Sequence, residues 1–315
     1  MQAIATAECK HPASIIPAPL RPQRRGASAR PASGALQRVF GPAPGLRQPV
    51  PACYDRAIDP ENGQNKEDGL VIALLADIHS NLEALEACLA HAQHCGAERY
   101  AFLGDLVGYG ADPEAVLDTV ARYAAAGAIV VKGNHDAAVE KRANYMNDSS
   151  TEVIEWTRTV LSAERRLYLA QLPLCVRDAS MCFVHASAAS PERWDYIDSP
   201  AAAQKSVEAA QMPYTFSGHV HDQMLFFQGA GGRMSAFPPL QGSPISARGH
   251  RRWLALVGSV GQPRDRNPAA AYALFDDVRA EITFHRVPYD NLAAARKIRS
   301  AGLPASIAYR VEMGI

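Results

Sequence analysis

A continuous apolar run over residues 70–76 is the feature that most constrains how this chain can fold. Such a run, with no polar residue inside it, is typical of a strand whose two faces are both buried. Helix signals then alternate with short apolar runs: a helix opening at Ser80-Asn81, a strand at 100–103, a helix over 112–126 and a strand at 128–131. This order predicts parallel strands joined by crossover helices.

The remainder of the chain predicts more helices and then a series of strands. Apolar spacing indicates helices near 150–161 and 164–172. Short apolar runs predict strands, the first two joined by a hairpin turn, at 174–177, 181–184, 214–216, 224–227, 254–257, 271–275 and 281–286. The segment 229–249 is rich in glycine and proline, so we expect a loop or an irregular hairpin there. We therefore predict one α/β domain over 69–315, with two packed sheets and helices outside.

The first 68 residues differ from the rest of the chain. They are rich in proline, alanine and arginine, and they lack apolar periodicity. We predict a disordered tail over 1–68, because such a segment has too little apolar surface to form a core. An organelle transit peptide and an over-long gene model remain alternatives, since the stretch is also poor in acidic residues.

Overall composition excludes several classes of protein. The formal net charge is zero, which argues against dedicated nucleic-acid binding and leaves only a local basic patch open. The six cysteines form no CxxC pair in a chain this long, so we expect reduced thiols and a cytoplasmic location. No apolar run is long enough to span a bilayer, and we predict no membrane partner.

Five short polar motifs follow predicted strands, and each supplies side chains that bind metals. In chain order they are Asp77-Ile78-His79, Gly104-Asp105, Gly133-Asn134-His135-Asp136, the single His185, and Gly218-His219-Val220-His221. Each motif alone is common, because Asp, Asn and Gly at a strand end often only form a turn. Together they lie where open α/β sheets bind ligands, beyond the carboxyl ends of strands. Imidazoles, carboxylates and an amide suit Zn, Fe or Mn, so the set predicts a metal site.

Two of these motifs place potential ligands two residues apart. In an extended backbone residues i and i+2 point the same way, so Asp77 and His79 would face one side of the chain. The same alternation would bring His219 and His221 together. The glycines within three of the motifs leave room for tight turns beside a crowded site.

The five motifs, in this order, resemble those of the calcineurin-like metallophosphoesterase superfamily over about residues 70–286. The resemblance implies a four-layer α-β-β-α sandwich of two mixed sheets flanked by helices. It also implies two divalent metal ions, with Mn, Fe, Zn and Ni as candidates. By resemblance, Asp105 bridges both ions and the other ligands divide between them: Asp77, His79 and His221 for the first ion, Asn134, His185 and His219 for the second.

The resemblance also implies hydrolysis at phosphorus. Two divalent ions can share a carboxylate and a hydroxide, and the hydroxide attacks phosphorus in line with the leaving oxygen. His135 follows the predicted ligand Asn134, so it can face the substrate without joining the coordination sphere. We assign His135 to stabilising the transition state or protonating the leaving oxygen. Asp136 either orients His135 or caps the following helix.

Several positions narrow the range of substrate classes. Serine/threonine protein phosphatases and symmetrical dinucleoside tetraphosphatases carry Asp-Arg where this chain has Gly108-Tyr109, and Glu where it has Asp136. The chain looks more like the small bacterial phosphodiesterase branch, which shares a stretch similar to 258–264. Within that stretch Arg264 either binds a substrate phosphate or pairs with an acidic neighbour, and Ser259 is a candidate pocket residue. Tyr109 either stacks on a nucleobase or only packs.

We therefore predict a phosphodiesterase, or phosphomonoesterase, that acts on small phosphorylated substrates, with nucleotides among the candidates. A protein phosphatase or dinucleoside tetraphosphatase on the same site is the alternative, and an inactive metal-binding scaffold is the alternative from a different class. All seven ligand positions and His135 are present, which favours an enzyme. The oligomeric state stays open. The remaining histidines have no predicted role, and His91 and His94 are expected on the solvent side of a helix.

Overall fold

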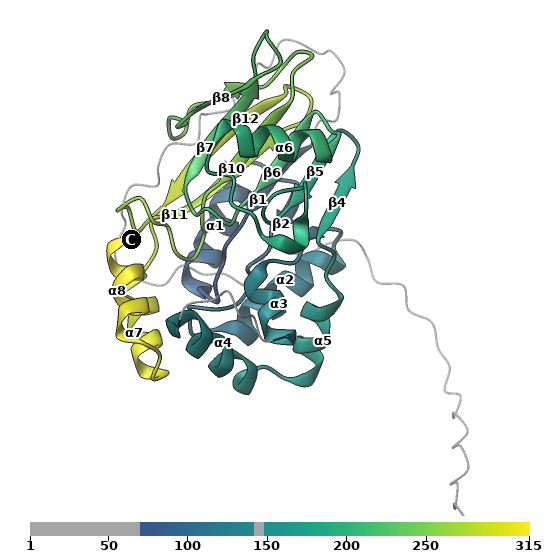
Figure 1. Ribbon diagram of the computed structural model, residues 1–315. Helices are drawn as coiled ribbons and strands as arrows, with labels where there is room; N and C mark the ends of the chain where they lie inside the picture. Colours follow the sequence, from purple (N-terminus) through teal and green to yellow (C-terminus); the bar gives the residue numbers. More distant parts are fainter. Residues whose placement is uncertain (1–69, 142–147) are drawn as a thin grey trace, which may run out of the picture. The chain divides into compact units, whose positions relative to one another are not determined.

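The computed structural model describes residues 70–141 and 148–315, which fall within one compact unit of the chain (Figure 1). The predicted tail, 1–68, lies outside the described residues. The strands are β1 (Val71–Leu75), β2 (Arg99–Phe102), β3 (Ile129–Val130), β4 (Cys175–Asp178), β5 (Met181–Val184), β6 (Tyr214–Ser217), β7 (Gln223–Gln228), β8 (Met234–Phe237), β9 (Ile245–Ser246), β10 (Trp253–Val257), β11 (Ala270–Asp276) and β12 (Glu281–Val287). The helices are α1 (Leu82–His94), α2 (Pro113–Ala125), α3 (Asn134–Glu140), α4 (Asp148–Val160), α5 (Ala163–Gln171), α6 (Pro200–Ala210), α7 (Asn291–Ser300) and α8 (Ala305–Met313), with a short 3-10 helix at Pro191–Arg193.

The strands form two mixed sheets of six strands each. In the first sheet, ordered β3-β2-β1-β11-β12-β9, Ile72 of β1 lies opposite Arg99 of the parallel β2 and Phe275 of the antiparallel β11. In the second sheet, ordered β4-β5-β6-β10-β7-β8, β6 runs parallel to both β5 and β10. The predicted crossovers are confirmed, because β1, β2 and β3 are parallel neighbours.

Apolar side chains fill both faces of each sheet. Ile72 and Leu74 of β1 pack between the sheets against Phe183 and Phe216 of the second sheet. The alternate residues of β1 face helices α1 and α2 on the outer side. On the other outer side, α6 packs on β10 through Val207. The four-layer sandwich implied by the sequence motifs is therefore confirmed (Figure 1).

Helices α4, α7 and α8 pack around a separate apolar cluster. Val153 of α4, Ile298 of α7 and Ile307 of α8 are each at most 1% exposed. Tyr109, from the loop after β2, belongs to the same cluster. The helices α7 and α8, yellow in Figure 1, are thus packed against the loop that carries the second polar motif.

The segment 229–249 contains more structure than predicted. A hairpin does form, because β8 pairs antiparallel with β7 of the second sheet. The chain then crosses to the first sheet, where β9 pairs with β12 and Ile245 lies opposite Ile282. A two-residue strand leaves no periodic pattern in the sequence, so β9 is set by this pairing and not by its own residues.

Three helices, α6, α7 and α8, have no counterpart among the predictions, whereas α3 is the helix that Asp136 was expected to cap. Two of them have local entry signals: Ser199 caps α6 just before Pro200, and Asp290 caps α7. Their buried faces consist largely of alanine, which makes the apolar periodicity weak. No helix among the described residues is long and apolar enough to cross a membrane.

One expectation about the region of α1 is wrong. His91 is only 6% exposed, because its side of α1 turns toward β11, and its Nδ1 lies 2.6 Å from the hydroxyl of Tyr272. Cys88, Cys175 and Cys182 are free.

Asn81 holds the loop after β1 to two distant segments. Its Oδ1 accepts the N–H of Ala84 at 3.2 Å and so caps α1, while its Nδ2 donates to Gly261 O at 2.9 Å and to the Tyr289 hydroxyl at 3.0 Å. Asn81→Ala should lower the free energy of unfolding by about 2–3 kcal/mol, since a cap and two buried hydrogen bonds are each worth about 1 kcal/mol.

Urea denaturation measures this loss of stability. Ser162→Ala is the matched control, because Ser162 is an exposed cap of α5 whose hydroxyl accepts only the N–H of Arg165. The control should lose about 1 kcal/mol or less. Equal losses in the two variants would contradict the bracing role of Asn81.

Candidate metal centre

The five polar motifs meet where the two sheets come together at the carboxyl ends of their parallel strands. The first follows β1, the second follows β2, the third opens α3, and the last two follow β5 and β6. Backbone hydrogen bonds tie these loops to each other: Asp77 N donates to Gly104 O at 3.1 Å, and Gly218 N to His185 O at 2.9 Å. Each of the seven predicted ligands and His135 is at most 7% exposed.

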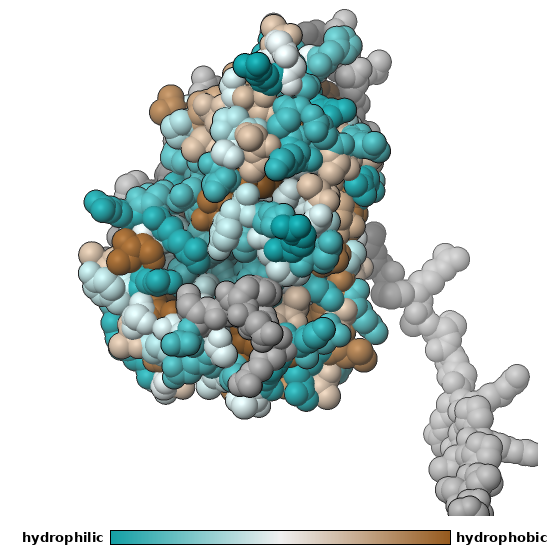
Figure 2. Space-filling model, in the orientation of Figure 1, coloured by the Kyte–Doolittle hydropathy of each residue, from teal (hydrophilic) through white to brown (hydrophobic). Residues whose placement is uncertain are grey.

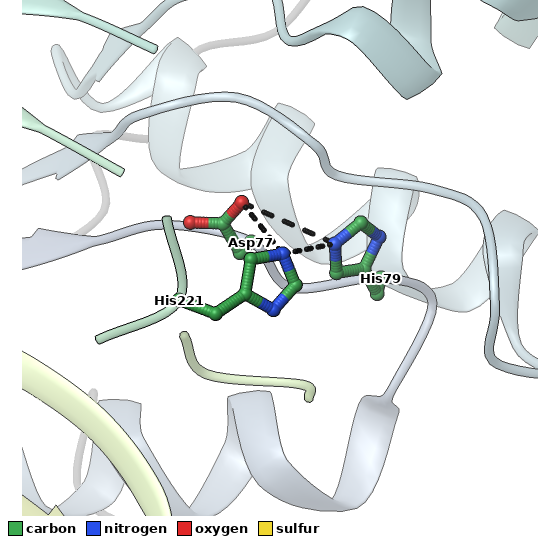
Figure 3. A group of neighbouring side chains, drawn as sticks. All are labelled: Asp77, His79 and His221. Carbon is green, nitrogen blue, oxygen red and sulfur yellow. Dashed lines mark hydrogen bonds and ion pairs between the residues drawn. The ribbon is translucent and has the colours of Figure 1, made fainter. Parts of the chain in front are cut away.

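One group of side chains joins the first and last motifs. Figure 3 shows Asp77, His79 and His221 pointing toward one another. The Oδ1 atom of Asp77 lies 3.3 Å from Nε2 of His221 and 4.0 Å from Nε2 of His79, and the two Nε2 atoms are 3.3 Å apart. This group could hold a metal ion, because one donor atom from each residue faces a common point.

A second group lies beside the first. Nε2 of His185 is 3.1 Å from Oδ1 of Asn134, 3.1 Å from Nδ1 of His219 and 3.4 Å from Oδ2 of Asp105. The same Oδ2 of Asp105 is 3.7 Å from Nε2 of His79, in the first group. Asp105 therefore faces both groups, and its Oδ2 is placed to be shared between them.

Backbone carbonyl groups fix the direction of three of these imidazole rings. Nδ1 of His79 donates to Val107 O at 3.2 Å, and Nδ1 of His185 donates to Leu103 O at 2.8 Å. Nδ1 of His221 donates to Gln262 O at 2.6 Å. Because a carbonyl can only accept, each Nδ1 carries a proton and each Nε2 is turned toward the centre. This is the arrangement that neutral imidazole needs in order to bind a metal.

The backbone around the ligands is not extended, so the proposed alternation along the motifs is wrong. The φ angles of Asp77, His79, Asp105, His219 and His221 are +52°, +50°, +51°, +69° and +71°, in the left-handed region. Each of these five ligands thus stands at a local bend of its loop. The side chains still converge, but they do so through these bends and not through a pleated strand.

Burial shapes the protonation of the group. Burial raises the pKa of Asp77 to about 7, and its Oδ1 has no hydrogen-bond partner among the described residues. Burial alone would lower the pKa of His185, but the carboxylate of Asp105 outweighs it and raises that pKa to about 9. Burial together with the neighbouring His185 lowers the pKa of His219 to about 3. An orphaned carboxylate oxygen facing imidazole lone pairs fits a bound cation.

His135 and Asp136 occupy different environments. His135 donates its backbone N–H to Oδ1 of Asp105 at 2.8 Å, and its buried Nδ1 has no partner among the described residues. Asp136 is fully buried, and its carboxylate accepts the N–H groups of Leu106, Val107 and Gly133 at 2.9, 3.2 and 2.9 Å. Of its two predicted roles, the geometry shows the cap of α3, and no hydrogen bond joins it to His135 among the described residues.

A cavity of about 210 Å³ opens beside both groups. On the face shown in Figure 2, hydrophilic residues surround the hollow near the centre. Every residue along the cavity has a polar side chain: Asp105, Tyr109, Asn134, His135, Tyr196, His219, His221, Arg264 and Arg310. Arg264 thus lies at the site and forms no ion pair with an acidic neighbour among the described residues. Ser259 does not line the cavity, since its hydroxyl is buried and donates to Asp77 O.

Tyr196 and Arg310 are cavity residues that the sequence motifs do not indicate. Tyr196 stacks on His219 with ring centroids 4.2 Å apart, yet it is 54% exposed. It stands in the loop between β5 and α6, where no regular pattern points to it. Arg310 comes from α8, far along the chain from every motif. A lone arginine on a surface helix is too common to single out from sequence.

The pair Gly108-Tyr109 has a structural explanation. Gly108 has φ +90°, and a Cβ there would overlap Nδ1 of His135, so only glycine fits. The ring of Tyr109 lies 4.6 Å from the rings of both His79 and His135. Its hydroxyl is within 3.1 Å of Ser150 Oγ in α4. Tyr109 therefore both packs and lines the cavity.

Comparisons with known proteins identify the family of this chain. Residues 70–279 match the calcineurin-like phosphoesterase superfamily domain. The chain is 32% identical over 250 residues to an uncharacterised protein of Methanocaldococcus jannaschii, a match that covers 78% of this chain and 98% of that protein.

Solved structures share the fold. The crystal structure of a metallophosphoesterase from Sphaerobacter thermophilus is similar, with a TM-score of 0.71, 34% identity, and coverage of 79% of this chain and 100% of that one. A hypothetical protein of Pyrococcus horikoshii has a TM-score of 0.64 and 21% identity, with coverage of 78% and 99%. The match to the family and the buried groups of potential metal ligands agree with each other. The chain belongs to the calcineurin-like phosphoesterase superfamily, and it is a metal-dependent hydrolase of phosphate esters.

Proposed function

We propose that the protein hydrolyses phosphodiesters with two divalent ions. Asp77, His79 and His221 would hold one ion, and Asn134, His185 and His219 the other. The observation that carries this proposal is the position of Asp105, whose Oδ2 faces a histidine of each group at 3.7 and 3.4 Å. A carboxylate shared in this way is what a two-metal site requires. The mixed nitrogen and oxygen donors suit Mn, Fe, Zn or Ni.

The surrounding side chains account for the rest of the reaction. When bound, the ions supply Lewis acidity and a hydroxide nucleophile at neutral pH. His135, in the cavity wall, protonates the oxygen of the leaving group. Arg264 binds a non-bridging oxygen of the phosphoryl group. Asp136 does not contact the substrate. Its carboxylate accepts the backbone N–H groups of Leu106, Val107 and Gly133, and these hydrogen bonds position the neighbouring Asp105 and His135.

The loop after β2 supports a diester as the substrate. Protein phosphatases and dinucleoside tetraphosphatases place a phosphate-clamping arginine where this chain has Tyr109. Here that position carries a ring that packs on His79 and bonds to Ser150, so no cation stands at this point. A diester has one negative charge fewer than a monoester and needs one cation fewer around its phosphorus.

Replacing His135 tests its role in the reaction. His135→Asn should lower kcat by roughly 100- to 1,000-fold, the usual contribution of a general acid, and leave the metal content unchanged. The measurement is hydrolysis of bis(p-nitrophenyl) phosphate with added Mn²⁺, alongside metal analysis of the protein. His250→Asn, at an exposed histidine, is the control and should keep full activity. An unmodified protein with two bound ions and no turnover would instead support an inactive scaffold.

Replacing Gly218 tests the metal site without changing a ligand. A Cβ at Gly218 would overlap Oδ2 of Asp77 and Cβ of Ala76, so Gly218→Ala should displace the carboxylate. We expect less bound metal per chain and a loss of activity of at least about tenfold, the usual scale for a disturbed ligand shell. Gly231→Ala is the matched control, because nothing lies near a Cβ there. Equal metal content in the two variants, measured by atomic emission, would contradict the role of Asp77.

The affinity for metal should depend on pH. Because the pKa of His185 without metal is about 9, the imidazole is protonated at neutral pH and must release a proton when an ion binds. The apparent affinity should therefore rise by about tenfold per pH unit between pH 7 and 9, and then level off. Competition with a chelator at several pH values measures this slope. An affinity that is already flat above the ordinary histidine pKa would contradict the release of a proton from His185 in this pH range.

A further inference from the structure

Arg310 is the feature of the cavity that the proposed reaction does not use. It lies in α8, outside the residues 70–279 that match the family, yet it lines the same cavity as His135 and Arg264. Its guanidinium makes no hydrogen bond or ion pair among the described residues. The two arginines reach the cavity from separate elements, since Arg264 stands in the loop after β10.

The position of Arg310 is built into the fold. Its helix packs against α7 and α4 through Ile307 and Val311, which are at most 3% exposed. The end of α8 is fixed as well, because Gly314 O accepts the N–H of Arg266 at 2.7 Å. The end of the helix that carries Arg310 is thus hydrogen-bonded to the loop that carries Arg264.

The cavity carries more positive charge than is needed to offset the single negative charge of a phosphodiester. Among the described residues that line it, Asp105 is the only acidic one, and that carboxylate faces the metal ligands. The diester carries one negative charge, and Arg264 beside the metal ions already offsets it. Arg310, which is partly exposed, adds a second cation to this lining, and a second anionic group on the ligand would offset it.

A second cavity, of about 270 Å³, gives such an anion room. Arg310 lines both cavities. The second is otherwise lined by Asp148 and Ser149 in the first turn of α4 and by Ser306 and Ile307 in the first turn of α8. Asp148 makes no ion pair with Arg310. The donors that this cavity offers a phosphoryl group are the guanidinium of Arg310 and the hydroxyls of the two serines, while Asp148 can only accept hydrogen bonds.

We infer that the substrate is a phosphate ester with a second phosphoryl group, and that Arg310 binds this second group while Arg264 and the metal centre bind the scissile one. The inference rests on the proposed function, and it names the substrate class for the same site. Arg310 is thus a residue that determines specificity and takes no part in bond cleavage.

Two chromogenic diesters that differ only in one phosphate test the inference. The p-nitrophenyl ester of thymidine 5′-phosphate has one phosphoryl group, and its 3′-phosphorylated counterpart has two. The metal-loaded full chain should prefer the second by roughly 10- to 100-fold in kcat/KM, the usual range for a charge-assisted hydrogen bond. Arg310→Gln should remove this preference by lowering kcat/KM for the second ester to about that for the first. Arg310→Lys should restore part of it.

Arg296→Gln is the matched control. Arg296 lies on the neighbouring α7, is exposed, and pairs only with Asp290 at 3.9 Å. It should keep the full preference. A loss of activity in Arg310→Gln that is equal for both esters, or no change for either, would overturn the inference while leaving the proposed function standing.

A binding measurement separates the two proposals. Titration calorimetry with thymidine 3′,5′-bisphosphate and with thymidine 5′-phosphate needs no turnover. The metal-loaded protein should bind the bisphosphate more tightly, and Arg310→Gln should remove that difference. Absence of hydrolysis of both esters at full metal content would overturn the proposed function, and equal binding of the two nucleotides would overturn the role of Arg310.

Discussion

Asp105 is buried where the two sheets meet, and the rest of the centre is arranged around its carboxylate. Oδ1 accepts the backbone N–H of His135, while Oδ2 faces His79 on one side and His185 on the other. Burial alone would raise the pKa of Asp105, but the surrounding imidazoles, led by His185, hold it well below its usual range. A buried negative charge of this kind demands cations, and this demand explains why histidines from four separate loops converge on one point.

The loops can converge only because their backbones are held as firmly as the side chains. Asp136 takes three N–H groups from the loop after β2 and the start of α3, so the loops of Asp105 and Asn134 move as one unit. Gly108 leaves space for His135 on the opposite side. The left-handed bends at the ligands cost roughly 1 kcal/mol each, and the rigid sheets behind them supply the stability that maintains this strain.

The parallel pairing of β1, β2 and β3, the presence of two packed sheets with helices outside, and the set of polar residues at the strand ends could be predicted from sequence. Strands buried on both faces leave unbroken apolar runs such as 70–76, and a polar residue directly after such a run marks the edge where ligands bind. Side-chain direction could not be predicted, because it depends on φ angles that the motif Asp77-Ile78-His79 does not reveal. Tyr196 and Arg310 were missed because an irregular loop and a distant surface helix bring them to the site only through tertiary packing.

The position of Arg310 on a helix outside the sheets has a consequence for how such enzymes diverge. The residues that would hold the metal ions stand on buried strand ends, where almost any replacement disturbs the core. The hairpin of α7 and α8 contacts this core at its margin, so its surface can mutate with little effect on the chemistry. Relatives with the same ligand set can therefore drift to different substrates, and inheritance of the motifs carries information about the reaction but little about the molecule that undergoes it.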